Sequence, residues 1–325
     1  MTAGFVLLIT AQIAVRGTVL AAETHEPLGF SIVTLQPDIG RQFTDPRGAF
    51  AFGNAKPGTY VLSVRQIGYT PFDTQLVIRG DSAIVIEVLL RHLAIELPPI
   101  TIAGRQCVRP GRPDSSDAAL LAVFNQLQEN ARRFALFADS YPFRPLIERT
   151  IRDISIRGDT VTSVESANDP DRPYEVGHVV FAKSPLWPDQ FLVHTAVLQD
   201  FGNTSFVENH CFDRAGVDTI AGRRLIRIDF EPPTRLRTTD IAGSAFLDST
   251  TYELRFTESR LTHPEWSVLS DIDSSTARTR FKSLAPGIPV QDSLIAITTY
   301  RGRHFTKRVE TQRLLDVHFR RRPPS

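Results

Sequence analysis

The sequence predicts a mainly β protein, with an N-terminal β-sandwich, one linker helix and a C-terminal antiparallel, curved β-sheet domain. Between residues 15 and 104, turn residues recur about every eight to twelve positions, a spacing typical of sandwiches. A helical apolar period follows residue 117, and alternating apolar and polar residues return after Arg149. Because a chain of 325 residues is too long for one sandwich, we expect two domains.

Three turn motifs organise the N-terminal region: Thr44-Asp45-Pro46-Arg47-Gly48, Pro57-Gly58-Thr59-Tyr60 and Ile67-Gly68-Tyr69. The side chain of Asp45 can accept hydrogen bonds from backbone amides ahead of it, and Gly48 can adopt a left-handed conformation at little steric cost. We therefore expect the turn residues to shape the backbone and not to take part in chemistry: Asp45, Gly48, Pro57, Gly58, Gly68 and Tyr69.

Short strands are expected between these turns. The run from 84 to 90 is nearly continuous apolar, which is typical of a strand covered on both faces. The predicted strands are 14–20, 31–36, 41–44, 49–52, 59–66, 72–78, 83–90 and 99–103.

Residues 105–145 are predicted to hold a linker and an amphipathic helix. The stretch 105–113 is basic and rich in Pro, and Asp117 can cap a helix that begins at Ala118. Pro142 and Pro145 follow its expected end. The apolar stripe of this helix, at steps of three and four residues, is Leu121, Phe124, Leu127, Ala131, Phe134 and Ala138.

Residues 146–325 are expected to form an antiparallel β domain with one buried and one wet face. In the run 224–231, Ile226, Ile228 and Phe230 share one face. In the run 251–257, Tyr252, Leu254 and Phe256 are likewise expected to point inward. Such a sheet can curve over the helix or over a cavity, and the pattern leaves both open.

The N-terminus and the two cysteines bear on export. Residues 4–14 form an apolar run of secretory length with no preceding Lys or Arg. Residues 1–14 are therefore read as a signal-peptide remnant, and the alternative is that residues 5–14 form a first buried strand. Cys107 and Cys211 are separated by 211 − 107 = 104 positions. In an exported protein they are expected to form a disulfide, and in a cytosolic one to be buried thiols.

Composition and motifs argue against several classes of function. With 37 basic and 36 acidic side chains, we expect neither nucleic acid nor an anionic membrane surface as the main partner. His-Glu-x-x-His, His-x-x-Glu, Gly-x-Ser-x-Gly and phosphate-loop motifs do not occur, so we predict no catalytic, cofactor-binding or metal-binding residues and no enzyme activity. The densest polar cluster, 208–213 around His210, is read as an ordinary strand with a half-cystine. After residue 14, no segment is long and apolar enough for a transmembrane helix.

The N-terminal motifs resemble the carboxypeptidase regulatory-like domain. The set consists of Thr44-Asp45-x-x-Gly48-x-Phe50, Pro57-Gly58-x-Tyr60 and Gly68-Tyr69, preceded by Val15–Val19 and Glu26-Pro27-Leu28. The resemblance covers residues 14–104 and implies an immunoglobulin- or transthyretin-like β-sandwich, also found in bacterial outer-membrane receptors. Phe30 stands where many members carry Gly, which implies a changed local bend. The resemblance is to the accessory sandwich and not to the zinc peptidase, so it supplies no catalytic residues.

The C-terminal half is more loosely similar to domains that follow such sandwiches in bacterial envelope proteins, including curved sheets of the lipoprotein-carrier type. The residues concerned are 222–232 and 241–248. The leading hypothesis is a non-enzymatic bacterial cell-envelope protein, periplasmic or outer-membrane-associated, whose sandwich binds an envelope protein or a glycan. One alternative is a carrier of a lipid-like apolar ligand in the C-terminal sheet. A second is a hydrolase with an unrecognised site, for which His210 is the residue to test.

Overall fold

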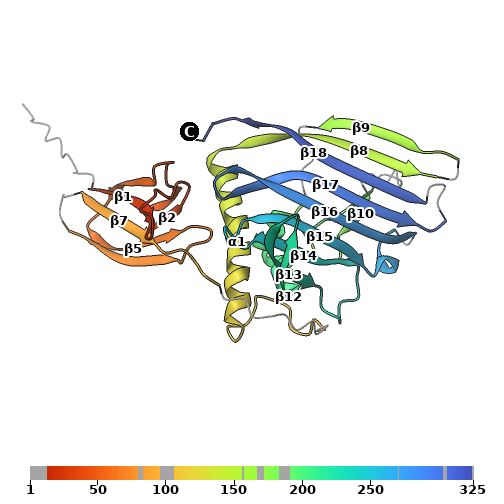
Figure 1. Ribbon diagram of the computed structural model, residues 1–325, viewed down its shortest axis with the longest axis horizontal. Coiled ribbons are helices and arrows are strands. Elements are labelled where there is room, and N and C mark those ends of the chain that lie inside the picture. The colour runs from red at the N-terminus through yellow and green to blue at the C-terminus, as the bar shows by residue number, and fades with distance from the viewer. Residues whose placement is uncertain are drawn as a thin grey trace, which may run out of the picture. The chain divides into compact units, whose positions relative to one another are not determined.

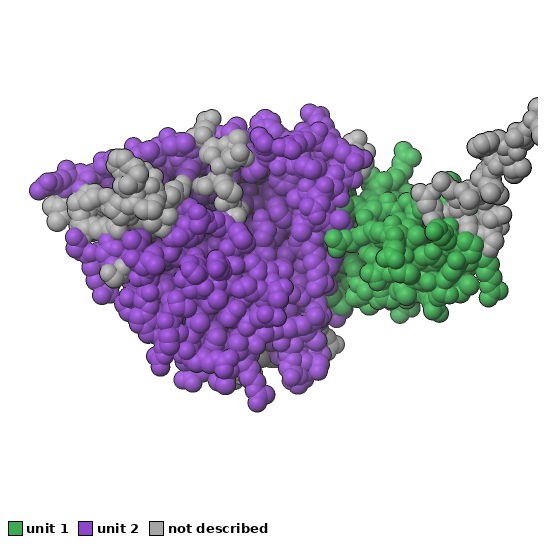
Figure 2. Space-filling view, turned by 180° about the vertical axis from the view of Figure 1, so that it is seen from behind, with its two compact units in different colours: residues 1–93, 324–325 green, residues 94–323 purple. Residues whose placement is uncertain are grey.

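The computed structural model describes residues 13–79, 83–95, 106–155, 157–166, 172–182, 191–269, 271–302 and 306–323. The chain divides into two compact units, one of residues 1–93 with 324–325 and one of residues 94–323 (Figure 2). Most of the expected signal segment, residues 1–12, lies outside the described residues, as does residue 104. The signal segment and the boundary at 104 therefore stay predictions.

The first unit is a sandwich of two sheets. The three-stranded sheet has the order β4-β1-β7, and the four-stranded sheet has the order β3-β2-β5-β6. Val15, Val33, Leu62 and Val88 are fully buried between them. The strands are β1 Ile13–Ala21, β2 Ile32–Gln36, β3 Gly40–Phe43, β4 Ala49–Ala55, β5 Gly58–Arg65, β6 Phe72–Ile78 and β7 Ile84–Leu90. The expected strand 99–103 lies outside the described residues.

The turn at Asp45 has the chemistry that its sequence indicates. The carboxylate oxygen Oδ1 of Asp45 accepts hydrogen bonds from the amides of Arg47 and Ala49, both at 2.9 Å. Gly48 has φ of +74°, and its carbonyl accepts from the amide of Val19 at 2.9 Å. A Cβ at position 48 would collide with the carbonyl oxygen of Val19. The turn thus needs glycine for both its backbone conformation and its close packing.

We expect Gly48→Ala to lower the free energy of unfolding of the first unit by about 1–3 kcal/mol, because a left-handed Ala is strained and its Cβ has no room. Urea denaturation followed by hydrogen exchange in β1 and β5 measures the change. Gly53→Ala is the matched control, since nothing lies within 4 Å of a Cβ there, and we expect a change within about 0.5 kcal/mol. Equal effects at both positions would contradict this account of the turn.

The other two turn motifs also lie where the chain changes direction. Pro57 and Gly58 stand at the crossing from β4 in one sheet to β5 in the other, and the hydroxyl of Tyr60 donates to the carbonyl of Lys56 at 3.0 Å. Gly68 has φ of +80°, and Tyr69 forms an isolated bridge with His92. These contacts are all structural.

Phe30 occupies a position at which many carboxypeptidase regulatory-like domains carry glycine. Its φ is +58°, in the left-handed region where glycine is favoured. The side chain is buried, and its ring lies 6.1 Å from that of Phe43. Burial of the ring therefore offsets the backbone strain at this position.

The prediction that strand 84–90 is covered on both faces is wrong. In β7, Val85 is 80% exposed and Leu89 is 42% exposed, whereas Val88 is buried in the core. The strand lies at an edge of the three-stranded sheet and pairs in parallel with β1. A continuous apolar run here marks an edge strand with an uncovered outer face.

The second unit is built around a nine-stranded antiparallel sheet (Figure 1). Its strands follow the order β12-β13-β14-β15-β16-β17-β18-β8-β9, so a meander is extended at one edge by the two strands that precede it in sequence. They are β8 Phe143–Ile154, β9 Thr160–Ser166, β12 Cys211–Ile220, β13 Arg223–Glu231, β14 Asp240–Asp248, β15 Leu254–Thr262, β16 Ile272–Ala285, β17 Ile288–Tyr300 and β18 Lys307–Phe319.

Several short elements and one long helix complete this unit. The helix α1, Ala118–Ser140, is the long one, and a short hairpin pairs β10 with β11. The remaining elements are β10 Val180–Ala182, β11 Phe191–Val193, η1 Leu198–Gly202, α2 Thr204–Glu208 and η2 Pro264–Trp266. The sequence did not predict the hairpin, η1 or α2.

The alternation expected for the sheet holds at β13 and breaks at β15. Ile226, Ile228 and Phe230 are buried as predicted. Leu254 is also buried, but the register shifts beside it and Thr257 takes the next buried position. Phe256 lies on the other face, where its ring stacks on that of Phe246 with centroids 4.2 Å apart. The prediction that Phe256 points inward is therefore wrong.

The helix α1 begins as predicted, with Oδ1 of Asp117 accepting from the amide of Leu120 at 2.9 Å. Phe124, Leu127 and Ala131 of the expected stripe are buried, whereas Leu121, Phe134 and Ala138 are half-buried. Two polar residues, Asn130 and Arg133, are fully buried instead. The Asn130 side chain donates to the carbonyl of Tyr252 and accepts from the amide of Leu254. It therefore binds the helix to the chain at the point where the register of β15 shifts.

Candidate ligand-binding site

An apolar cavity of about 380 Å³ lies between α1 and the inner face of the second unit's sheet. Phe134 and Ala138 contribute to it from the last turns of α1, and Leu198 and Gln199 from η1. The strands supply Phe143, Pro145, Ile147, Phe281, Pro289, Val290, Gln291, Gln312, Leu314 and Val317, and Pro142 completes the lining. The helix thus covers part of the inner face and leaves room beside it. We call this space the apolar cavity.

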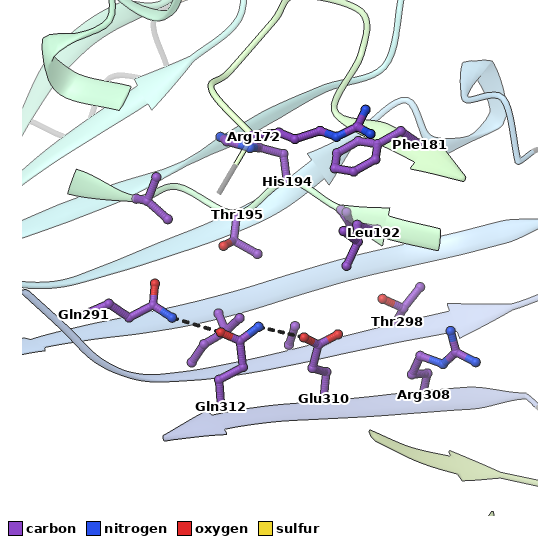
Figure 3. A pocket seen from close by; sticks show the side chains of 14 residues that line it. Arg172, Phe181, Leu192, His194, Thr195, Gln291, Thr298, Arg308, Glu310 and Gln312 are labelled. Atoms are coloured by element: carbon purple, nitrogen blue, oxygen red, sulfur yellow. Dashed lines mark hydrogen bonds between the residues drawn. The ribbon is translucent and has the colours of Figure 1, made fainter. Parts of the chain in front are cut away.

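A second, polar space of about 100 Å³ lies between the β10–β11 hairpin and strands β17 and β18 (Figure 3). Its sheet side carries Gln291, Leu294, Ala296, Thr298, Arg308, Glu310 and Gln312. The opposite side carries Arg172, Phe181, Leu192, Val193, His194, Thr195 and Val197. We call it the polar slot. Because Gln291 and Gln312 line both spaces, the polar slot adjoins the apolar cavity.

Hydrogen bonds and ion pairs fix the side chains on the floor of the polar slot. Nε2 of Gln291 donates to Gln312 at 3.0 Å, and Nε2 of Gln312 donates to Glu310 at 2.8 Å (Figure 3). The guanidinium of Arg149 meets both oxygens of Glu310, at 2.7 and 2.8 Å. Paired bonds of this kind hold a carboxylate in a defined orientation.

Arg308 is held in the same way. Its Nε and Nη2 atoms lie 2.6 and 2.8 Å from the two oxygens of Asp153. Burial alone would lower the pKa of Arg308. The hydrogen bond to Asp153, followed by electrostatic interactions with its neighbours, raises this pKa above the usual value. Arg308 is therefore cationic, and its charge is compensated by Asp153.

Buried polar contacts hold the parts of the chain around Arg172 and His194, which form the wall of the polar slot opposite the sheet. Oδ2 of Asp200 accepts from the amide of Val197 at 2.9 Å and lies 3.0 Å from Nε2 of His194. The hydroxyl of Tyr174 donates to Asp240 at 2.6 Å. Burial raises the pKa of Asp240 and that of Tyr174, so the phenol stays protonated and keeps its role as donor. The wall of the polar slot is thereby fixed to β14.

His210 belongs to this structural network. It lies between α2 and β12 and not within a strand, so the prediction of a strand through residues 208–213 is wrong before Cys211. Its Nδ1 lies 2.8 Å from the carbonyl oxygen of Phe206, and its Nε2 lies 2.9 Å from that of Ile241. The ring is fully buried and stacks on Phe206. Both nitrogens are thus occupied, and the geometry gives the hydrolase hypothesis no support at His210.

Cys107 and Cys211 form a disulfide, as expected for an exported protein. The bond joins the segment before α1 to the first residue of β12. Further hydrogen bonds hold this segment: the carbonyl of Cys107 accepts from the amide and the hydroxyl of Thr234, both at 3.1 Å, and the amide of Gly111 donates to the carbonyl of His210 at 2.9 Å. The disulfide thus stabilises the second unit internally.

The turn residues and the cysteines singled out from the sequence line neither space, whereas Phe134 and Ala138 of the predicted helix stripe line the apolar cavity. The six turn residues all lie in the first unit. Cys107 lies in the segment before α1, and Cys211 is the first residue of β12. The lining residues of the polar slot were missed because they come from four separate strands and two loops. One signal was available: the inner face of β13 carries Ile226, Ile228 and Phe230, whereas that of β17 and β18 carries glutamines, threonine and charged residues.

Among the described residues, no group of three or more His, Cys, Asp or Glu side chains is placed to hold a metal ion. No helix within the described ranges is long and apolar enough to cross a membrane.

Comparison with known families assigns the first unit. Residues 15–102 match the model of the CarboxypepD_reg-like domain, so this region of the chain is such a domain, as the turn motifs indicated. No curated protein matches the chain significantly.

The chain also has weak likenesses to solved structures. A Streptococcal ancillary pilin shares 14% identity at a TM-score of 0.23, with 50% of this chain and 49% of the pilin covered, so the match spans about half of the pilin. A LolA superfamily protein from Nitrosomonas europaea shares 10% identity at a TM-score of 0.30, with 62% and 94% covered. A putative outer membrane lipoprotein-sorting protein domain from Vibrio parahaemolyticus shares 12% identity at a TM-score of 0.32, with 61% and 93% covered.

Proposed function

We propose that the protein is a non-enzymatic binding protein whose second unit holds a lipid-like ligand in the apolar cavity. The observation that carries this proposal is the apolar cavity. It lies beside α1, which covers only part of the inner face of the sheet. Its volume is about 380 Å³. This has room for roughly twelve methylene groups if each takes about 30 Å³, which is the volume per water molecule in the liquid. A cavity with apolar walls and a few polar groups at one end is the usual form of a small-ligand site.

The chemistry of the lining favours binding over catalysis. Phe134, Leu198 and Leu314 offer contact area to an alkyl chain. The carboxylates at the polar end, Glu310 and Asp153, are each engaged by an arginine, so neither is placed as a free general base. The site can therefore hold a molecule but has no evident means of activating one.

We expect Ala138→Trp to weaken the binding of 1-dodecanol by about tenfold or more. The indole would occupy the end of the cavity that Ala138 lines, and each excluded methylene costs about 0.8 kcal/mol of burial. Displacement of the uncharged dye N-phenylnaphthylamine from the full chain measures the affinity. Ala135→Trp is the matched control, since Ala135 is exposed on the same helix.

Mass spectrometry of a solvent extract of the purified protein provides an independent test. A retained apolar molecule that Ala138→Trp removes and Ala135→Trp keeps supports the carrier. If wild-type protein binds no dye and no alcohol and retains no apolar molecule, the carrier function is wrong.

We also propose that the protein acts outside the cytoplasm, in the bacterial envelope, and that its sandwich binds an envelope protein or a glycan there. The disulfide supports the oxidising location. The uncovered outer face and edge of β7 support a protein partner, because strand edges accept further strands.

The oxidising location can be tested on the two cysteines. In protein isolated from its host, the cysteines should resist a thiol-alkylating reagent until a reductant is added. Alkylation without reductant would contradict this location.

A further inference from the structure

The polar slot retains one uncompensated positive charge. Arg149 is paired with Glu310, Arg308 with Asp153, and His194 with Asp200. Arg172, the remaining charged residue of the lining, forms no ion pair within the described part of the chain. We propose that the polar slot binds an anionic group, a carboxylate or a phosphate, at the head of the ligand whose chain occupies the apolar cavity. The inference rests on the proposed carrier function and names the class of ligand: an anionic amphiphile.

The position of Arg172 suits this role. Its guanidinium carbon lies 4.6 Å from the centroid of the Phe181 ring (Figure 3). Stacking on an aromatic face stabilises the cation and orients its plane, while the edge with its N–H groups stays available. A carboxylate or phosphate accepts two parallel hydrogen bonds from such an edge.

The junction between the two spaces fits a molecule with a polar head and an apolar chain. Gln291 and Gln312 line both spaces. Hydrogen bonds link the side chain of Gln291 to that of Gln312, and that of Gln312 to Glu310. Beyond them, the apolar cavity is walled by residues such as Leu314 and Phe134. A single ligand can therefore place its chain among apolar side chains and its head between Arg172 and the polar floor.

The test compares dodecanoate with the uncharged 1-dodecanol by displacement of N-phenylnaphthylamine from the full chain at low ionic strength. We expect Arg172→Gln to weaken dodecanoate binding about five- to tenfold, because the lost pair is partly exposed to solvent. The affinity for dodecanol should not change. The matched control is Arg223→Gln, an exposed arginine at the start of β13, which lowers the net charge equally and should leave both affinities unchanged. Added salt should reduce the effect of Arg172→Gln.

The outcomes separate this inference from the carrier function. If dodecanol binds and Arg172→Gln leaves dodecanoate binding unaltered, or weakens both ligands equally, the carrier stands and the anionic head site is overturned. If neither ligand binds the wild-type chain, the carrier function fails and the inference with it. Inorganic phosphate and acetate are added alone as competitors. If either one occupies the slot as tightly as dodecanoate does, the slot is an independent anion site and the proposed link to a chain is overturned.

Discussion

Replacing both Cys107 and Cys211 by Ala is expected to lower the free energy of unfolding of the second unit by about 4–5 kcal/mol in the chain-entropy model. The disulfide closes a loop with a sequence separation of 104 residues, and α1, β8, η1 and α2 all lie within that loop. Without the bond, the unfolded chain has access to more conformations, so more conformational entropy is lost on folding. The hydrogen bonds between Thr234 and Cys107 would remain, but they contribute much less.

Urea unfolding monitored by far-ultraviolet circular dichroism measures the effect, and hydrogen exchange assigns it to a unit. The first unit is the internal control: amides in β1 and β5 should keep their protection, since no residue of the disulfide lies there. Wild-type protein treated with reductant should behave like the double variant. A loss below about 1 kcal/mol would show that packing, and not the bond, holds the segment before α1 to β12.

The first unit could be predicted from sequence because its turns are local. The bonds from the Arg47 and Ala49 amides to Asp45 span only a few residues, so the residues that need them are next to those that provide them. Burial of β7 could not be predicted in this way. Whether both faces of a strand are covered depends on what packs over its sheet, and the face of β7 that carries Val85 and Leu89 is exposed.

In the second unit, sequence periodicity does not always predict which side chains are buried. Phe256 follows the expected alternation in sequence, but the shift in register next to Leu254 reverses its face. At this point Leu254 is held by a residue about 120 positions earlier, since the side chain of Asn130 in α1 accepts a hydrogen bond from the Leu254 amide. Asn130 and Arg133 read as the wet side of an amphipathic helix, and both are buried. A polar residue that anchors a helix to a turn has the same sequence signal as one that faces water.

The candidate site was hidden for a related reason. Gln291 in β17 and Glu310 and Gln312 in β18 have the sequence pattern of the exposed face of an antiparallel sheet. Only the fold shows that they lie on the inner side of the sheet, across from Arg172 and Phe181 (Figure 3). Cavities arise where the covering elements end, and this boundary is a property of the whole unit.

Arg133→Met is expected to destabilise the second unit by about 3–5 kcal/mol, the usual cost of removing one partner from a buried charged network. Arg133 is fully buried, and its Nε donates to the carbonyl of Gly287 at 3.0 Å in the turn between β16 and β17. Burial lowers the pKa of Arg133 to about 10, with Glu129 and Glu253 opposing the shift, so the side chain stays cationic at neutral pH. Methionine would leave the Gly287 carbonyl without this donor and would remove the cation that interacts electrostatically with Glu129 and Glu253.

Chemical denaturation of three variants tests this anchoring role. Arg132→Met changes an exposed arginine one residue earlier in α1 and should alter stability by less than about 0.5 kcal/mol. Arg133→Lys keeps a charge but not the planar guanidinium, so we expect a loss between those of the other two variants. Because Phe134 lines the apolar cavity, Arg133→Met should also weaken dodecanol binding when α1 loses its hold on the β16–β17 turn. If Arg133→Met is as stable as the wild type, apolar packing replaces the network without loss, and Arg133 is not an anchor of α1 on the β16–β17 turn.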